Sequence, residues 1–231
     1  MHNGHGGAGW QPAVAPFAFK DAVIVATATG RRAQTLRELR DHLRVVEVDS
    51  VYHHFWGRRL QPRFDDVEHH NDFAAWAADG LRDGLLAERL GAIDPADYSD
   101  LEQLRNKVLD VVDERLHDRE WVPASPSDGE FHFLRPRVVV FDTGRRLDHP
   151  DGLPEALAEA SLGSLFYHIV EARRRNPGGI DDFRAWLQSF GDPYAELVDA
   201  LAHIDPYFLS LSEVRRRWIN TCLDYVGGAI V

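Results

Sequence analysis

Two histidine and aspartate sets are the residues of this sequence best suited to chemistry. His54 lies 18 positions before Asp72, and His168 lies 14 positions before Asp182. Imidazole and carboxylate groups can transfer protons as a general acid–base pair. They are also ligands for borderline or hard divalent metals such as zinc, iron or manganese. The two sets therefore predict a metal site or an acid–base pair, if the fold brings each set together.

A structural interpretation explains the same four residues. An aspartate at the start of a helix can cap exposed amides and hydrogen-bond a nearby histidine, which would lock two elements together. Glu171 follows His168 at helical spacing and adds a third metal-ligand candidate, but Gly57 stands at the corresponding position after His54. A symmetric pair of metal centres would lack one ligand, so the structural interpretation is favoured.

Three further features have candidate roles. Tyr52 and Tyr167 stand close to the two histidines and are ligand-binding candidates, although their apolar neighbours favour packing in a core. Residues 68–70 read Glu-His-His, which suits either a metal site or an exposed loop. Cys222 is the only cysteine, which excludes an intramolecular disulfide and a thiolate metal cage. No catalytic residue can be assigned from these patterns.

The segments that carry these residues occur twice. Residues 50–55 are echoed 114 positions later by residues 164–169. An Asp-Phe-x-x-Trp signature follows each copy, at 72–76 and at 182–186. The sequence Thr-Gly-Arg-Arg at 29–32 returns unchanged at 143–146. Such matching spacing indicates a tandem duplication.

Local patterns predict mostly helices. Short β-favouring runs at 22–27 and 137–141 are expected to be strands, each closed by a turn at its Thr-Gly-Arg-Arg sequence. Leucines at three- and four-residue spacing predict an amphipathic helix over 35–43. Another helix is expected to start at Asn71 or Asp72 and to bury Phe73 and Trp76. We therefore expect a mainly α protein with short β-strands (α+β), built from two tandem homologous helical units related by a pseudo-two-fold.

The composition shifts along the chain define the expected boundaries. Residues 1–16 are rich in glycine, histidine and proline and read as a flexible tail. Residues 117–130 carry the proline, serine and glycine of a linker. The first repeat unit is then 17–116, the second is 131–226, and residues 227–231 form a C-terminal tail.

The paired units resemble a known type of sequence. The Tyr-His, Asn-Asp-Phe and Trp pattern, carried here by Tyr52, Asn71 and Trp76 and by their counterparts, resembles an uncharacterised prokaryotic family. Its members have one or two such units followed by a Leu- and Ala-rich helix. Asp181 stands where that pattern has asparagine. The resemblance implies a domain type and no activity.

Charge and hydropathy limit the classes of partner. The net charge of -11 would repel phosphate backbones, so a nucleic-acid partner is not expected. The arginine runs at 173–175 and 215–217 are interpreted as solvated helix faces. No apolar run is long enough to span a bilayer, so a membrane partner is not expected either. A cytoplasmic protein is predicted.

Two hypotheses of function follow from these patterns. The leading one is a non-catalytic binding or regulatory protein, because the duplication carries no complete catalytic constellation. The alternative is a metal-dependent enzyme that uses His54 with Asp72 and His168 with Asp182, with a divalent metal as its cofactor.

Overall fold

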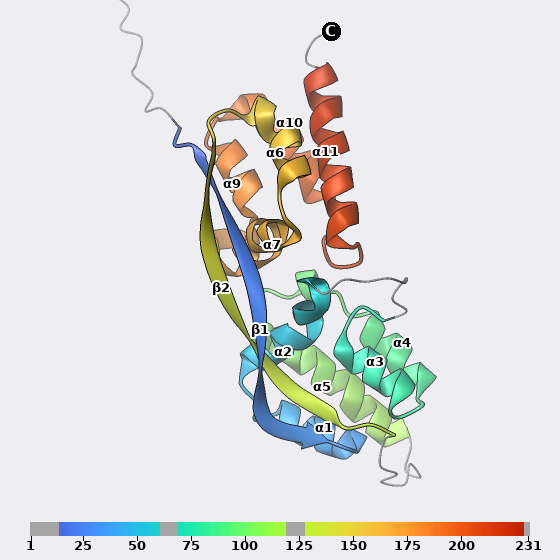
Figure 1. Ribbon diagram of the computed structural model, residues 1–231. Coiled ribbons are helices and arrows are strands. Elements are labelled where there is room, and N and C mark those ends of the chain that lie inside the picture. The colour runs from blue at the N-terminus through green and yellow to red at the C-terminus, as the bar shows by residue number, and fades with distance from the viewer. Residues whose placement is uncertain (1–13, 61–68, 119–127, 229–231) are drawn as a thin grey trace, which may run out of the picture.

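A long two-stranded ribbon organises the molecule. The computed structural model describes residues 14–60, 69–118 and 128–228. Within these residues the sheet consists of two antiparallel strands, β1 (Phe17–Ala33) and β2 (Phe131–Leu147), in a register that places Val23 opposite Val139. The ribbon runs along one side of the molecule, with α1 to α5 at one end and α6 to α11 at the other (Figure 1). The rest of the described chain is mainly helical, as the sequence predicts.

The predicted turns after two short strands are wrong. Both strands continue through their Thr-Gly-Arg-Arg sequences and are 17 residues long. Gly30 and Gly144 adopt positive φ angles of 79° and 74°. The strand register shifts at both glycines. One shift lies between Ala28 and Arg32 of β1, on either side of Gly30. The other lies between Ala18 and Lys20 of β1, whose partners in β2 flank Gly144. The glycines therefore form bulges within the ribbon, because a bulge needs the same left-handed backbone as a turn.

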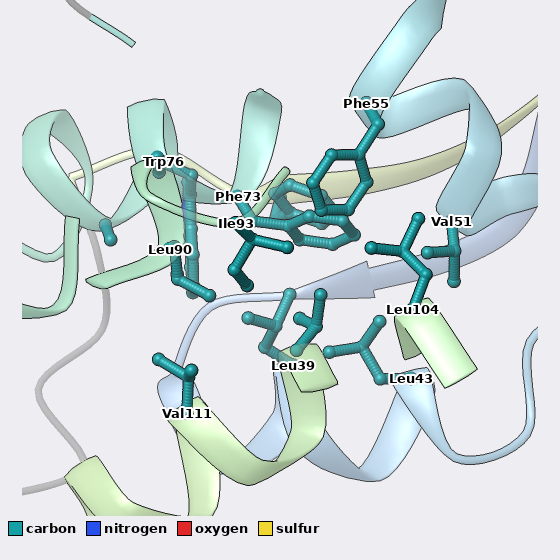
Figure 2. Close-up of a cluster of buried hydrophobic side chains, with 14 of the residues drawn as sticks. Leu39, Leu43, Val51, Phe55, Phe73, Trp76, Leu90, Ile93, Leu104 and Val111 are labelled. Atoms are coloured by element: carbon teal, nitrogen blue, oxygen red, sulfur yellow. The ribbon is translucent and has the colours of Figure 1, made fainter. Parts of the chain in front are cut away.

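The first helical body follows β1. Its elements are α1 (Leu36–Leu43), α2 (Val48–Trp56), η1 (Gly57–Leu60), α3 (Asp72–Asp79), α4 (Gly84–Gly91), η2 (Pro95–Asp97) and α5 (Leu101–Asp118). The helix predicted over 35–43 is confirmed as α1, whose start is fixed by a capping box between Thr35 and Glu38. Its leucines enter a core with Phe55, Phe73 and Leu104 (Figure 2).

The second helical body follows β2. Its elements are η3 (Pro150–Gly152), α6 (Leu153–Glu159), α7 (Leu162–Leu165), the π-helical segment η4 (Phe166–Glu171), α8 (Ala172–Arg175), η5 (Pro177–Gly179), α9 (Asp182–Gln188), η6 (Asp192–Tyr194), α10 (Ala195–Ala202) and α11 (Leu211–Gly228). Its core gathers around Phe183, Trp218 and Cys222.

The two bodies exchange their strands. Phe131 and Phe133, at the start of β2, are buried in the core of the first body. Phe17 and Phe19, at the start of β1, are buried in the core of the second body. In the chain each strand precedes the helices of its own half, but the start of each strand completes the core of the other half.

Candidate functional site

His54 joins three elements. Its Nδ1 atom lies 2.9 Å from Asp72 Oδ2, at the start of α3. Its Nε2 atom accepts a hydrogen bond of 3.2 Å from the backbone N–H of Leu134 in β2. Because an amide can only donate, Nε2 must be the acceptor and Nδ1 carries the proton that Asp72 accepts. The imidazole therefore connects α2, α3 and the exchanged strand.

His168 makes the same set of contacts in the second body. Its Nδ1 atom lies 2.7 Å from Asp182 Oδ2, and its Nε2 atom accepts from the backbone N–H of Lys20 at 2.9 Å. The predicted hydrogen bond between histidine and aspartate is thus confirmed in both sets. The amide on the far side of each ring could not be predicted, because the strand that supplies it belongs to the other half of the chain.

The residue before each aspartate caps the helix. Asn71 accepts from the backbone N–H of Ala74 at the start of α3, and Asp181 accepts from that of Arg184 at the start of α9. The predicted start of a helix at Asn71 or Asp72 is confirmed, with Asn71 as the cap. Asp72 and its counterpart are thereby left to bind the histidines.

Asp182 has the denser set of partners. Arg175 and Asn176 each donate to it at 2.8 Å, in addition to His168. Burial favours the protonated carboxyl, but these three hydrogen bonds outweigh it and lower the pKa of Asp182. The carboxylate is held in its charged form within a network of donors.

The described residues gather no metal-binding cluster. No group of three or more histidine, cysteine, aspartate or glutamate side chains among them is placed to hold a metal ion. Glu171, the predicted third ligand beside His168, accepts a hydrogen bond of 2.6 Å from the Tyr52 hydroxyl. Both nitrogens of each histidine are engaged as described. Of the Glu-His-His candidate at 68–70, Glu68 lies outside the described residues.

The tryptophans of the two Asp-Phe-x-x-Trp signatures form hydrogen bonds to the backbone just before each strand. Trp76 Nε1 donates to the carbonyl of Gly129 at 2.7 Å, two residues before β2 begins with Phe131. Trp186 Nε1 donates to the carbonyl of Ala15 at 2.9 Å, just before β1. Both indoles are buried, at 8% and 9% exposure, which confirms the predicted burial of Trp76.

A cavity opens where the two halves of the chain meet. Its volume is about 820 Å³, within the usual range for a small-molecule site. The first half supplies α2 and the segment from η2 to α5, and the second half supplies the segment from η4 to η5. The lining residues are Tyr52, Trp56, Pro95, Ala96, Asp97, Tyr98, Ser99, Asp100, Leu101, Leu104, Val170, Arg173, Arg174, Asn176, Gly178 and Gly179.

Tyr52 forms part of one cavity wall and links the two halves. Its hydroxyl is bound to Glu171, and the Arg174 guanidinium lies 4.2 Å from its ring centroid. Burial, together with the charge of Glu171, raises the pKa of Tyr52 well above its ordinary value. Tyr167, the other predicted tyrosine, does not line this cavity; its ring packs under Arg175 at 4.1 Å.

The arginines of the cavity were missed as site residues, because a run of three arginines on a helix is typical of a solvated face. Arg174 pairs with Asp49 of the first half at 2.8 Å. Burial lowers the pKa of Arg173, whose Nε atom is buried without a hydrogen-bond partner. The signal that could have indicated them is the Asn-Pro-Gly-Gly sequence at 176–179, which ends the helix and brings its last turn to the junction.

The fold and this junction define a mainly helical α+β protein in which two helical bodies share one ribbon. The chain belongs to a family of unknown function (DUF5752), whose model matches residues 14–223. This confirms the resemblance to an uncharacterised family. The chain is also similar to the solved structure of OrfY from Thermoproteus tenax, with 28% sequence identity and a TM-score of 0.79 over 92% of this chain and 96% of that one. No curated protein matches it. Among the described helices, none combines the length and apolar character needed to cross a membrane.

Proposed function

We propose that the protein is a non-catalytic binding or regulatory protein, built from two copies of one helical unit, whose ligand site is the cavity where the copies meet. The observation that carries this proposal is that the two histidine and aspartate sets and the cavity-lining residues have different contacts. The histidine and aspartate sets are used for internal contacts, whereas the cavity is lined by polar and aromatic side chains from both halves.

The repeated contacts support the duplication. The histidine contacts to Leu134 and Lys20, and the tryptophan contacts to Gly129 and Ala15, reach positions 114 apart. Thr29 and Thr143, also 114 apart, donate to the carbonyls of Phe133 and Phe19. A pseudo-two-fold relation between two copies of one unit explains all three coincidences at once. In this proposal the repeat units are residues 17–116 and 131–226, and the helices of each unit pack against the strand start of the other unit.

A ligand screen with a cavity-obstructing variant tests the proposed site. Ala96 is exposed and lines the cavity, so Ala96→Trp should obstruct part of it, whereas Ala158→Trp places the same side chain on the exposed face of α6. The screen measures the Tm of each protein against nucleotides, amino acids, organic acids and phosphorylated metabolites. A true ligand at a hundredfold excess over its Kd stabilises the native state by about 2.7 kcal/mol.

We expect a compound that raises the Tm of the wild-type protein and of Ala158→Trp but leaves Ala96→Trp unchanged. A screen without any stabilising compound, or equal responses from both variants, would contradict the proposed site. Elemental analysis of the untagged protein addresses catalysis by metal separately: a tightly held stoichiometric metal that disappears in His54→Ala or His168→Ala would reverse the proposal in favour of a metal-dependent enzyme.

A further inference from the structure

We propose that the cavity at the junction binds a small organic anion, and that Arg173 holds the phosphate or carboxylate group of this ligand. The inference rests on the proposed function, since it names the chemical class of the ligand for the same cavity. It comes from the state of one side chain, which differs from that of every arginine around it.

Arg173 is a largely desolvated cation without a bonded partner. No hydrogen bond or ion pair joins its guanidinium to any residue in the described parts of the chain, and its Nε atom is buried. A buried charge is costly unless it is paired and hydrogen-bonded. Its burial is deep enough to lower the pKa of Arg173.

The neighbouring arginines all have acidic partners. In the same helix, Arg174 pairs with Asp49 and Arg175 pairs with Asp182, both at 2.8 Å. Arg184, on the adjacent α9, pairs with Asp181 at 3.3 Å. Arg173 is therefore the member of its run that lines the cavity without an acidic partner at ion-pair distance among the described residues.

Three carboxylates influence Arg173 electrostatically, and each of them already accepts a hydrogen bond from a backbone amide. Asp94 and Asp205 belong to the Ile-Asp-Pro turns of the two halves, and both influence Arg173 electrostatically, as does Asp181. Asp94 accepts from the backbone N–H of Ala96 at 2.8 Å, and Asp205 accepts from that of Tyr207 at 2.7 Å. They moderate the local potential, but none supplies the paired oxygen atoms that a guanidinium fork binds.

The remaining walls suit a ligand with a flat body. Tyr52, Trp56 and Tyr98 contribute aromatic surface to them. The volume of about 820 Å³ exceeds what a bare phosphate ion needs. A ligand with an acidic head at Arg173 and an aromatic or similarly planar body against these aromatic side chains fits this lining.

Three small probes distinguish binding of an anionic group from binding of an aromatic ring. Phenyl phosphate and benzoate carry the two anionic groups on a ring, and benzamide is the neutral counterpart of benzoate. Binding is measured on the full chain by titration in ¹H,¹⁵N NMR spectra, following the amides of Gly178 and Gly179 and the Nε–H signal of Arg173. Sodium chloride at equal ionic strength controls for screening.

We expect saturable shifts with at least one anion at up to about 10 mM, and affinity at least about tenfold weaker for benzamide. Arg173→Ala should weaken anion binding by at least about tenfold, and Arg173→Lys should restore part of it because the charge remains. Arg216→Ala, which removes an exposed arginine of α11, should bind like the wild-type protein. Circular dichroism and Tm establish that each variant is folded.

The pattern of responses decides the inference. A response to phenyl phosphate alone assigns a phosphate ligand, and a response to benzoate alone assigns a carboxylate. Equal binding of benzamide, unchanged binding by Arg173→Ala and Arg173→Lys, or no response to any probe would overturn the anion assignment. In each of these cases the Ala96→Trp screen still reports on the cavity itself, so the two proposals fail separately.

Discussion

At the scale of single residues, the two central histidines act as two-sided connectors. Each ring donates to a carboxylate at a helix start and accepts from a strand amide, as described for His54 and His168. Aromatic rings enclose them: Phe131 stacks on Phe73 beside His54, and Phe17 stacks on Phe183 beside His168. Such a ring has no free nitrogen for proton transfer or metal binding unless one of these bonds is broken.

A double-mutant cycle tests this connector role. His54→Ala and Asp72→Ala should each lower the free energy of unfolding by about 2 to 4 kcal/mol, because each leaves buried polar groups unpaired. The double variant should cost less than the sum of the two, with a coupling of about 0.5 to 3 kcal/mol, since both changes break one contact. Urea denaturation measures the three values.

The exposed pair of His203 and Asp199 is the matched control for that cycle. Its side chains are 76% and 80% exposed and 4.0 Å apart, so the same alanine substitutions should be additive and nearly neutral. If the buried pair were additive as well, the histidine and aspartate would not act as one structural unit.

His53 should make stability depend on pH. Burial, with His54 beside it, lowers the pKa of His53 to about 4, whereas the unfolded chain has the ordinary value of about 6.5. Between these values the unfolded state binds more protons, so stability falls as the pH falls through this window, by up to about 3 kcal/mol. His53→Gln should flatten the dependence of Tm on pH between about 4 and 6.5.

The exposed His203→Gln is the control for this pH series and should keep the wild-type slope. A wild-type Tm that stayed constant across the window, or a His53→Gln profile with an unchanged slope, would rule out His53 as the source.

At the scale of elements, helix starts and buried stripes could be predicted from the sequence. Asn71 followed by Phe73 and Trp76 specifies a capped helix with one apolar side, and α3 has both. Local chemistry is sufficient there, because the cap and the stripe lie within a few residues. The strand lengths could not be predicted, because Gly30 suits a turn and a bulge equally and the choice depends on a strand about a hundred residues away.

For the same reason, only part of the cavity lining could be predicted from local sequence patterns. Tyr52 was identified as a ligand-binding candidate from its position beside the histidines. Arg173 was not, because its surroundings come from turns in both halves of the chain, at Asp94 and at Asp205. Only the packing of the two bodies creates the desolvation that distinguishes this arginine from a solvated one.

Gly163 tests the contact between α7 and β1. A Cβ atom at this position would lie 2.2 Å from Asp21 Oδ1 and 2.3 Å from the carbonyl oxygen of Ala22. Gly163→Ala should therefore destabilise the protein by about 1 to 3 kcal/mol, because the strand backbone has to move. Gly84→Ala in α4 meets nothing within 4 Å and should be neutral or slightly stabilising. Equal Tm values for the two variants would show that α7 can shift freely on the strand.

At the scale of the whole molecule, neither helical body has a complete core without the other half of the chain. Phe131 and Phe133 are at most 4% exposed in the first core, and Phe17 and Phe19 are at most 6% exposed in the second. Removing such aromatic side chains from a core costs about 3 to 5 kcal/mol each, which is comparable to the stability of a small domain.

Dividing the chain should therefore give two fragments that fold only together. Fragments 1–122 and 123–231, expressed separately, should each show little cooperative unfolding, and an equimolar mixture should recover the circular dichroism and the single transition of the intact chain. Replacing Phe17 and Phe19 by alanine in the first fragment should weaken the assembly, because these rings complete the second core. A fragment that melts cooperatively alone would contradict the mutual dependence of the two bodies.

Because of the exchange of strands, the two bodies receive their strand starts at different stages of synthesis. The ribosome makes β1 first, so the second body finds Phe17 and Phe19 already present when its helices emerge. Helices α1 to α5 emerge before β2 and must wait for Phe131 and Phe133, at roughly 5 to 20 residues per second. For on the order of seconds the apolar side chains of the nascent first half lack these two rings, and chaperones or a neighbouring nascent chain can reach them during this period.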